Sequence, residues 1–170
     1  PIYESVIRYS GATPVPISLR EEIGFSFSAE AVLAKITPNT RLIILNSPSN
    51  PTGGVVDEAE LALLAKGLED HTHVAILSDE IYSHMLYDGR NHVSLLQYDE
   101  MRDRTIMLDG WSKTYAMTGW RLGFAVWPKA IAETATRLAI NCHSCVNAPT
   151  QFAGIAALKG PHDQVTKMVK

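Results

Sequence analysis

Three polar segments of the sequence each follow an apolar run and carry residue types that could do chemistry. They read SPSNPTGG (residues 47–54), SDEIY (78–82) and WSK (111–113). The first segment offers the amide of Asn50, and the second offers the carboxylate of Asp79 three residues before the phenol of Tyr82. The third places the hydroxyl of Ser112 beside the amine of Lys113. If the three segments meet in space, an acid, a phenol, an amide and a nucleophilic amine share one site.

Lys113 is the most informative of these residues because it lies just beyond a run that reads as a buried strand. Loss of hydration at such a position favours the neutral amine, which attacks carbonyl groups to form Schiff bases. Each residue taken alone has a plainer explanation. A lone lysine can extend its amine to solvent, Asp79 can end a turn, and Arg121 can be a surface ion-pair partner.

Taken together, the residues meet the requirements of one ligand. Asp79 can keep a ring nitrogen protonated, while Tyr82 and Asn50 can hydrogen-bond a phenolate oxygen on the same ring. Ser112 and the planar guanidinium of Arg121 can hold a phosphate. With a lysine to form the Schiff base, this set predicts pyridoxal 5′-phosphate as the cofactor.

Four apolar runs predict the strands that position these residues: RLIILN (41–46), VAILSD (74–79), TIMLDG (105–110) and LGFAVW (122–127). The first three are continuously apolar, as parallel strands buried on both faces are. A further segment, TPVPI (13–17), contains two prolines and can be at most an edge or weak strand.

Helical patterns alternate with these runs. We expect one from Asp57, which is placed as an N-cap, one from about Lys129, one after Pro149 and a shorter one over residues 28–36. Residues 82–93 contain an Asp-Gly pair and predict a local excursion or hairpin. The pattern indicates an α/β fold with a mostly parallel sheet, whose ligand lies beyond the carboxyl ends of the strands.

Composition excludes several classes of protein. The 170 residues carry 15 basic and 18 acidic side chains, a balance that argues against binding to nucleic acid or to a membrane surface. Each apolar run is far shorter than the about 20 residues that span a bilayer. Two cysteines are too few for a disulfide scaffold and fit a reducing cytosol, so we expect a cytoplasmic protein.

The motifs SPSNPTG, SDEIY and SKTYAMTGWRLGF, in this order, closely resemble those of the class I/II aminotransferases. These are pyridoxal-phosphate enzymes of fold type I, and the likeness is to the bacterial aspartate and aromatic subgroup. It runs from Pro1 to about Leu158. The resemblance implies a three-layer α-β-α sandwich in which residues 122–127 form an antiparallel strand.

The resemblance also implies a role for each site residue. Lys113 forms the Schiff base and then carries the substrate proton, Asp79 holds the pyridine nitrogen, and Tyr82 and Asn50 hold the ring oxygen. We expect Lys113, Asp79 and Tyr82 to be the catalytic residues, and no metal is expected. Ser112 and Arg121 bind the phosphate by the same resemblance, and the peptide bond between Asn50 and Pro51 is cis.

The sequence departs from the family pattern at two positions. Relatives often carry a phosphate-binding serine where this chain has Gly110, and Trp111 is bulkier than the usual residue there. The chain also begins at Pro1 in mid-pattern. We therefore expect residues 1–170 to be the central part of the cofactor-binding large domain, with the N-terminal segment and the small domain outside this chain.

By this resemblance, the intact protein is a homodimeric transaminase that moves an amino group between an amino acid and a 2-oxo acid, and this chain alone is poorly active. Three alternatives remain. One is a C–S lyase on the same fold, one is an aminotransferase-like sensor domain of a transcription regulator, and one is a redox protein. The last would use Cys142 and Cys145, which form a C-x-x-C motif, although two small buried residues are the simpler interpretation.

Overall fold

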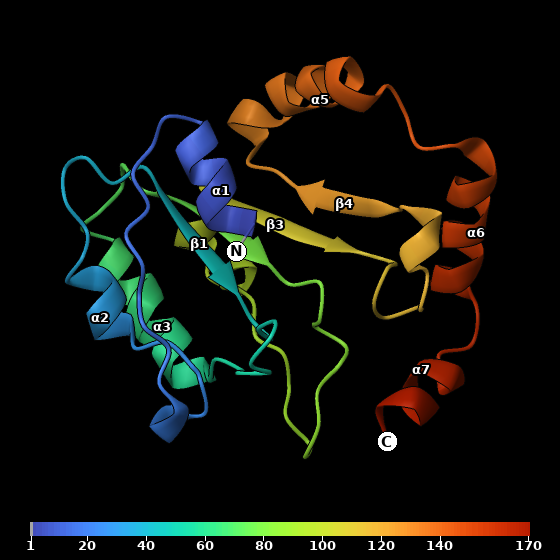
Figure 1. Ribbon diagram of the computed structural model, residues 1–170, viewed down its shortest axis with the longest axis horizontal. Helices are drawn as coiled ribbons and strands as arrows, with labels where there is room; N and C mark the ends of the chain where they lie inside the picture. The colour runs from blue at the N-terminus through green and yellow to red at the C-terminus, as the bar shows by residue number, and fades with distance from the viewer. Residues whose placement is uncertain (1) are drawn as a thin grey trace.

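The four apolar runs form one mixed sheet in the computed structural model, which describes residues 2–170 (Figure 1). The strands are β1 (Leu42–Asn46), β2 (Ala75–Asp79), β3 (Thr105–Gly110) and β4 (Gly123–Val126), in the spatial order β1-β2-β3-β4. Strands β1, β2 and β3 are parallel, and β4 pairs antiparallel with β3. The predicted α/β class, the mostly parallel sheet and the antiparallel fourth strand are confirmed.

The weak strand predicted over residues 13–17 is wrong, because this segment has no regular secondary structure. Prolines at positions 14 and 16 lack the backbone N–H that a ladder requires. The excursion over residues 82–93 is confirmed, but no hairpin forms there. Asp88 and Gly89 make its turn with φ values of 57° and 70°.

The longer predicted helices are present. The α-helices are α1 (Ile2–Tyr9), α2 (Ala29–Leu33), α3 (Glu58–Leu68), α4 (Asp99–Arg102), α5 (Lys129–His143), α6 (Ala148–Lys159) and α7 (Asp163–Val169). Residues 2–170 also contain the 3₁₀ turns η1 (Glu21–Ile23), η2 (Leu95–Gln97) and η3 (Thr118–Trp120), of which η3 connects β3 to β4. Asp57 caps α3 as expected, since its Oδ1 accepts a hydrogen bond of 2.9 Å from the amide of Glu60. The helix predicted over residues 28–36 is shorter in the structure and ends at Leu33.

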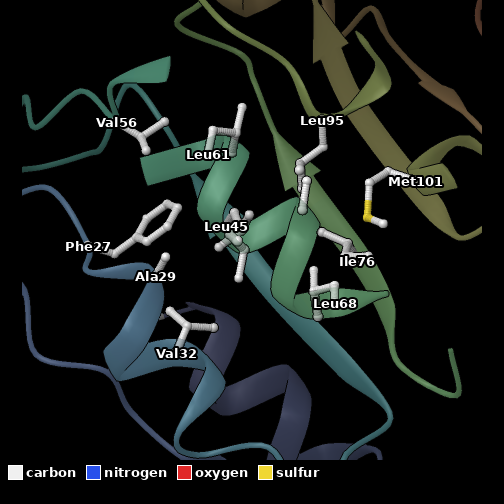
Figure 2. Packing of buried hydrophobic residues seen from close by; sticks show 12 residues of the cluster. Phe27, Ala29, Val32, Leu45, Val56, Leu61, Leu68, Ile76, Leu95 and Met101 are labelled. Carbon is white, nitrogen blue, oxygen red and sulfur yellow. The ribbon is translucent and has the colours of Figure 1, made fainter. Parts of the chain in front are cut away.

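The core lies between one face of the sheet and the pair α2 and α3 (Figure 2). Leu61, Leu64 and Leu68 of α3 are buried together with Leu45 of β1 and Ile76 of β2. Burial of side chains of this size contributes about 1.5–3 kcal/mol each. This packing fixes which face of each strand looks toward α3.

Alternation along β2 then decides where its polar residues point. Ile76, Ser78 and Glu80 are buried on the side of α3, so Asp79 between them points to the opposite face. Helices α5 and α6 lie beyond β4, away from α2 and α3 (Figure 1). Within residues 2–170 no helix combines the length and apolar character that crossing a membrane requires.

Candidate functional site

Asn46 joins the carboxyl ends of β1 and β2. The register pairs it with Asp79, and its Nδ2 donates to the carbonyl oxygen of Asp79 at 3.1 Å. Its Oδ1 accepts a hydrogen bond of 3.0 Å from the backbone amide of Asn50. One side chain therefore fixes the segment that carries Asn50 against the end of β2. Sequence reasoning missed this role, although a polar residue at the end of an apolar run was the available signal.

Asn50, Tyr82 and Lys113 come together from three separate segments. Asn50 Nδ2 donates to the Tyr82 hydroxyl at 3.1 Å, and Lys113 Nζ lies 5.8 Å from the centroid of the Tyr82 ring. The Asn50–Pro51 peptide bond is cis, as the resemblance implies. An amide, a phenol and an amine thus share the carboxyl edge of the sheet.

Asp79 has a partner that the sequence did not reveal. The hydroxyl of Tyr3, on α1, donates a hydrogen bond to Asp79 Oδ2. Burial raises the pKa of Tyr3 most, and the hydrogen bond to Asp79 raises it further. The phenol therefore stays protonated and remains a donor to the carboxylate. The two residues are 76 positions apart, so no local pattern could have predicted the contact.

Trp111 anchors the turn that presents Ser112 and Lys113. Its indole Nε1 donates to the carbonyl oxygen of Gly154 on α6 at 3.0 Å, and its ring packs edge-to-face on Phe124. Its own carbonyl oxygen accepts hydrogen bonds from two backbone amides of the turn, at 3.2 and 3.3 Å. A Cβ at position 154 would lie 2.4 Å from Leu122 Cδ2, so a larger residue there would displace the Leu122 side chain that packs against α6.

Ser112 and Arg121 are linked through Thr118. The Thr118 hydroxyl donates to the Ser112 carbonyl oxygen at 2.9 Å, and Arg121 Nη1 donates to the Thr118 carbonyl oxygen at 3.0 Å. Arg121 is exposed, at a left-handed φ of 54° that ends η3. The turn keeps both predicted phosphate ligands on the segment that also carries the lysine.

Gly110 leaves no space for the serine that relatives often carry. A Cβ at this position would lie 2.9 Å from both Gly123 Cα and the Leu122 carbonyl oxygen. These are backbone atoms at the β3–β4 pairing, so a side chain would force the strands apart. The missing hydroxyl is therefore a consequence of strand packing in this chain.

The donor set fits pyridoxal phosphate. Asp79 offers a carboxylate for a protonated ring nitrogen, and the Asn50–Tyr82 pair offers donors for a ring oxygen. Lys113 offers an amine beside that pair, and Ser112 and Arg121 offer hydroxyl and guanidinium donors for a phosphate.

The comparison with known families decides the relationship of this chain. All of residues 1–170 match the family described as aminotransferase class I and II. The chain belongs to this family. The resemblance inferred from the three motifs is confirmed.

Individual class I and II aminotransferases are similar over nearly the whole chain. The aspartate aminotransferase of Rhizobium meliloti (strain 1021) is 38% identical over 162 residues, which cover 95% of this chain and 40% of that protein. The aromatic-amino-acid aminotransferase 2 of Thermococcus litoralis is also 38% identical, over 95% of this chain and 41% of that protein.

Solved structures agree with this aminotransferase fold. A crystal structure of the R. meliloti aspartate aminotransferase superposes with a TM-score of 0.94 at 36% identity, covering 98% of this chain and 42% of that one. A crystal structure of an aromatic aminotransferase from Pyrococcus horikoshii OT3 superposes with a TM-score of 0.92 at 36% identity. The superposition covers 98% of this chain and 45% of that one. The chain thus spans about two fifths of the length of the relatives it matches.

The C-x-x-C motif differs from its prediction. Cys142, in the last turn of α5, and Cys145 are both free and exposed, not buried as expected. Helix α5 has no buried residue, which explains the exposure of Cys142. Among the residues that the structure describes, no group of three or more His, Cys, Asp or Glu side chains could hold a metal ion.

Proposed function

We propose that the intact protein is a pyridoxal-phosphate-dependent transaminase that moves an amino group between an amino acid and a 2-oxo acid. The observation that carries the proposal is the meeting of Lys113, Tyr82 and Asn50 beside Asp79 in a chain of the aminotransferase family. When bound, the cofactor supplies an electron sink at its protonated ring.

Each residue of the site then has one task. The Lys113 amine would hold the cofactor at its carbonyl carbon, and the same amine would move the proton at the substrate Cα. Asp79 keeps the ring nitrogen protonated, with its own carboxylate held by the hydroxyl of Tyr3. Tyr82 and Asn50 hold the ring oxygen, and their mutual hydrogen bond of 3.1 Å supports a shared target.

Ser112 and Arg121 bind the phosphate in this proposal. Their position on the same turn as Lys113 supports it, because the turn would hold the amine and the phosphate end of one ligand in a fixed relation. Gly110 contributes no side chain, so the phosphate contacts from this segment come from those two residues.

The proposal extends to the intact protein. Residues 1–170 form the central part of its cofactor-binding large domain, which agrees with the two fifths of their relatives that they span. We propose a homodimer in the cytoplasm, where the free thiols of Cys142 and Cys145 would remain reduced.

The complete reading frame that contains this chain provides the test. Purified with cofactor, it should show the visible absorption of a lysine–pyridoxal adduct, and Lys113→Ala should abolish this band. Exposed Lys35 provides the control variant Lys35→Ala, which should keep the band. A band that persists in Lys113→Ala contradicts the assignment.

Screening amino acids against 2-oxo acids then identifies the reaction. Transfer requires an acceptor 2-oxo acid, whereas a C–S lyase converts one sulfur-containing amino acid and water to a thiol, ammonia and a 2-oxo acid. The relatives described above carry aminotransferase names, which favours transfer. Ammonia release without an acceptor would overturn the proposal in favour of the lyase.

A further inference from the structure

Glu80 is a buried carboxylate that the proposed reaction does not use. Its exposed fraction is 5%, and it follows Asp79 directly, on the opposite face of the sheet. Its Oε1 accepts hydrogen bonds from the hydroxyls of Ser78 at 2.9 Å and Ser94 at 2.7 Å. Its Oε2 lies 2.7 Å from His92 Nε2, whose N–H is the donor. We call Glu80 and these three donors the Glu80 clamp.

A buried carboxylate remains in a protein interior only when its lone pairs are well partnered, because desolvation of the charge is costly. The Glu80 clamp meets this condition with three donors. The backbone amide of Glu80 also donates to the Leu108 carbonyl oxygen of β3 at 2.9 Å. Main chain and side chain of this residue are therefore both fixed.

The Glu80 clamp joins the two ends of the excursion that follows β2. Ser78 belongs to the strand, whereas His92 and Ser94 lie where the chain returns from residues 82–93. Tyr82 lies on the outgoing part of this excursion. The Glu80 carbonyl oxygen accepts from Ser83 N at 2.8 Å, so the turn that carries Tyr82 begins at the clamp.

We propose that Glu80 is a positioning residue that sets the place of the Tyr82 phenol and the Asp79 carboxylate by holding the excursion closed. The inference rests on the proposed cofactor-binding roles of Asp79 and Tyr82. Loss of the clamp should leave the fold intact but let the Tyr82 segment move relative to Asn50 and Lys113.

Other charged groups surround the Glu80 clamp. Asp109, at the end of β3, is half-buried, and burial raises its pKa most, with Glu80 adding to the increase. His84, on the excursion, and His92 oppose that increase. The carboxylates of Glu80 and Asp109 and the imidazoles of His84 and His92 therefore lie near one another, on the face of the sheet opposite Asp79.

The variant Glu80→Gln tests the clamp in the complete protein. The amide keeps an oxygen for the serine hydroxyls but turns an NH₂ group toward His92 Nε2. The His92 N–H then faces a second donor instead of a carboxylate oxygen, so this contact is lost. The variant should therefore bind pyridoxal phosphate more weakly than wild type.

The expected loss relative to wild type, about tenfold, corresponds to one hydrogen bond to a charged group. Affinity is measured by equilibrium titration with pyridoxal phosphate for wild type, Glu80→Gln and the exposed control Glu22→Gln. The control should bind as wild type does. An affinity ratio of one between Glu80→Gln and wild type overturns the proposal.

Hydrogen exchange of the cofactor-free protein separates this inference from the proposed function. The amides of Ser83 and Met85 should exchange faster in Glu80→Gln, while those of α3 keep the wild-type rate. Unchanged exchange at Ser83 and Met85 overturns the clamp even if the protein proves to be a transaminase. Faster exchange with unchanged cofactor affinity overturns the positioning role.

If wild type binds no cofactor, the proposed function fails, and the positioning role that rests on it fails as well. The hydrogen-exchange data still decide in that case whether the Glu80 clamp holds the excursion over residues 82–93. If Glu80→Gln does not fold, Ser94→Ala removes one donor and keeps the carboxylate. That variant should show the same faster exchange at Ser83 and Met85, and unchanged exchange there overturns the proposal.

Discussion

Asp79 shows how much one side chain at the site depends on its neighbours. Tyr3 donates to its Oδ2, and Asn46 holds its backbone carbonyl, so the carboxylate has a fixed direction before any ligand binds. Lys113, Asp79, Tyr82 and Asn50 could be selected from sequence because polar residues follow buried strands. Tyr3 could not, because its contact with Asp79 joins residues 76 positions apart. Asn46 and Glu80 also stand at the end of apolar runs, but their hydrogen-bond partners become known only from the folded chain.

Replacing Asp79 should separate cofactor binding from turnover. In the complete protein, Asp79→Ala should still bind pyridoxal phosphate through the lysine and phosphate contacts, yet lose turnover by about a hundredfold or more. The reason is that a ring nitrogen without its carboxylate partner is a poorer electron sink. Single-turnover rates measure the effect, and exposed Asp70 provides the control Asp70→Ala. Near-wild-type rates in Asp79→Ala would refute the role.

Asp109 should give the stability of the chain a distinctive dependence on pH. Burial raises the pKa of this carboxyl, so the native state binds more protons than the unfolded state between the ordinary aspartate value of about 3.9 and the raised value. Stability from this group therefore falls as the pH rises through that window. Asp109→Asn should remove this fall while its amide oxygen keeps the hydrogen bond from Gly110 N.

Urea unfolding at a series of pH values measures this effect. The free energy of unfolding of Asp109→Asn, minus that of wild type, should be larger above the window than below it. A difference that stays constant with pH would show that Asp109 does not titrate differently in the two states.

At the scale of elements, Arg104 connects α3 to the start of β3. Its Nη2 donates to the Leu68 carbonyl oxygen at 2.8 Å and its Nη1 to the His71 carbonyl oxygen at 2.9 Å. These carbonyls lie at and after the end of α3, and each also accepts one backbone amide, from His71 N at 2.9 Å and from Val74 N at 3.0 Å respectively. Because α3 covers the core face of the sheet, this fork helps to fix the helix on which strand orientation depends.

Arg104→Met should lower the free energy of unfolding by about 2 kcal/mol, since two carbonyls lose a charged donor. The exposed residue Arg90 provides the matched variant Arg90→Met, which should change it by less than about 0.5 kcal/mol. Denaturant titration of both variants measures the difference. Equal stabilities for the two variants would show that the fork contributes nothing.

The sequence predicted the elements best where burial dominates. Residues 41–46, 74–79 and 105–110 are mostly apolar, and each forms a parallel strand within one residue of its predicted bounds, although β1 lies at the edge of the described sheet. Residues 13–17 form no strand because their prolines cannot donate to a ladder. Helices α1 and α7 had no expected counterpart; neither has a buried residue, so neither carries the core pattern that identifies a helix.

At the scale of the whole molecule, the apolar side chains on the surface are the informative feature. Phe152 on α6 is 73% exposed, Leu138 on α5 is 63% exposed, and Val6 on α1 is 58% exposed. On α6 the exposed apolar side chains recur every three residues, since Ile155 and Leu158 are exposed as well. Apolar surface of this kind marks sites that bind other protein. The relatives are more than twice as long, so we expect further parts of the intact protein to cover this face of α6.

The chain on its own should therefore have little transaminase activity. Arg121 is exposed and the chain spans about two fifths of the relatives it matches, so we expect incomplete sets of contacts to both the cofactor and the substrate. Side-by-side assays of this 170-residue chain and the complete reading frame, at equal cofactor concentration, measure the difference. Comparable turnover by the two would mean that Lys113, Asp79, Tyr82 and their neighbours suffice for the reaction, and that the exposed apolar face of α6 serves another purpose.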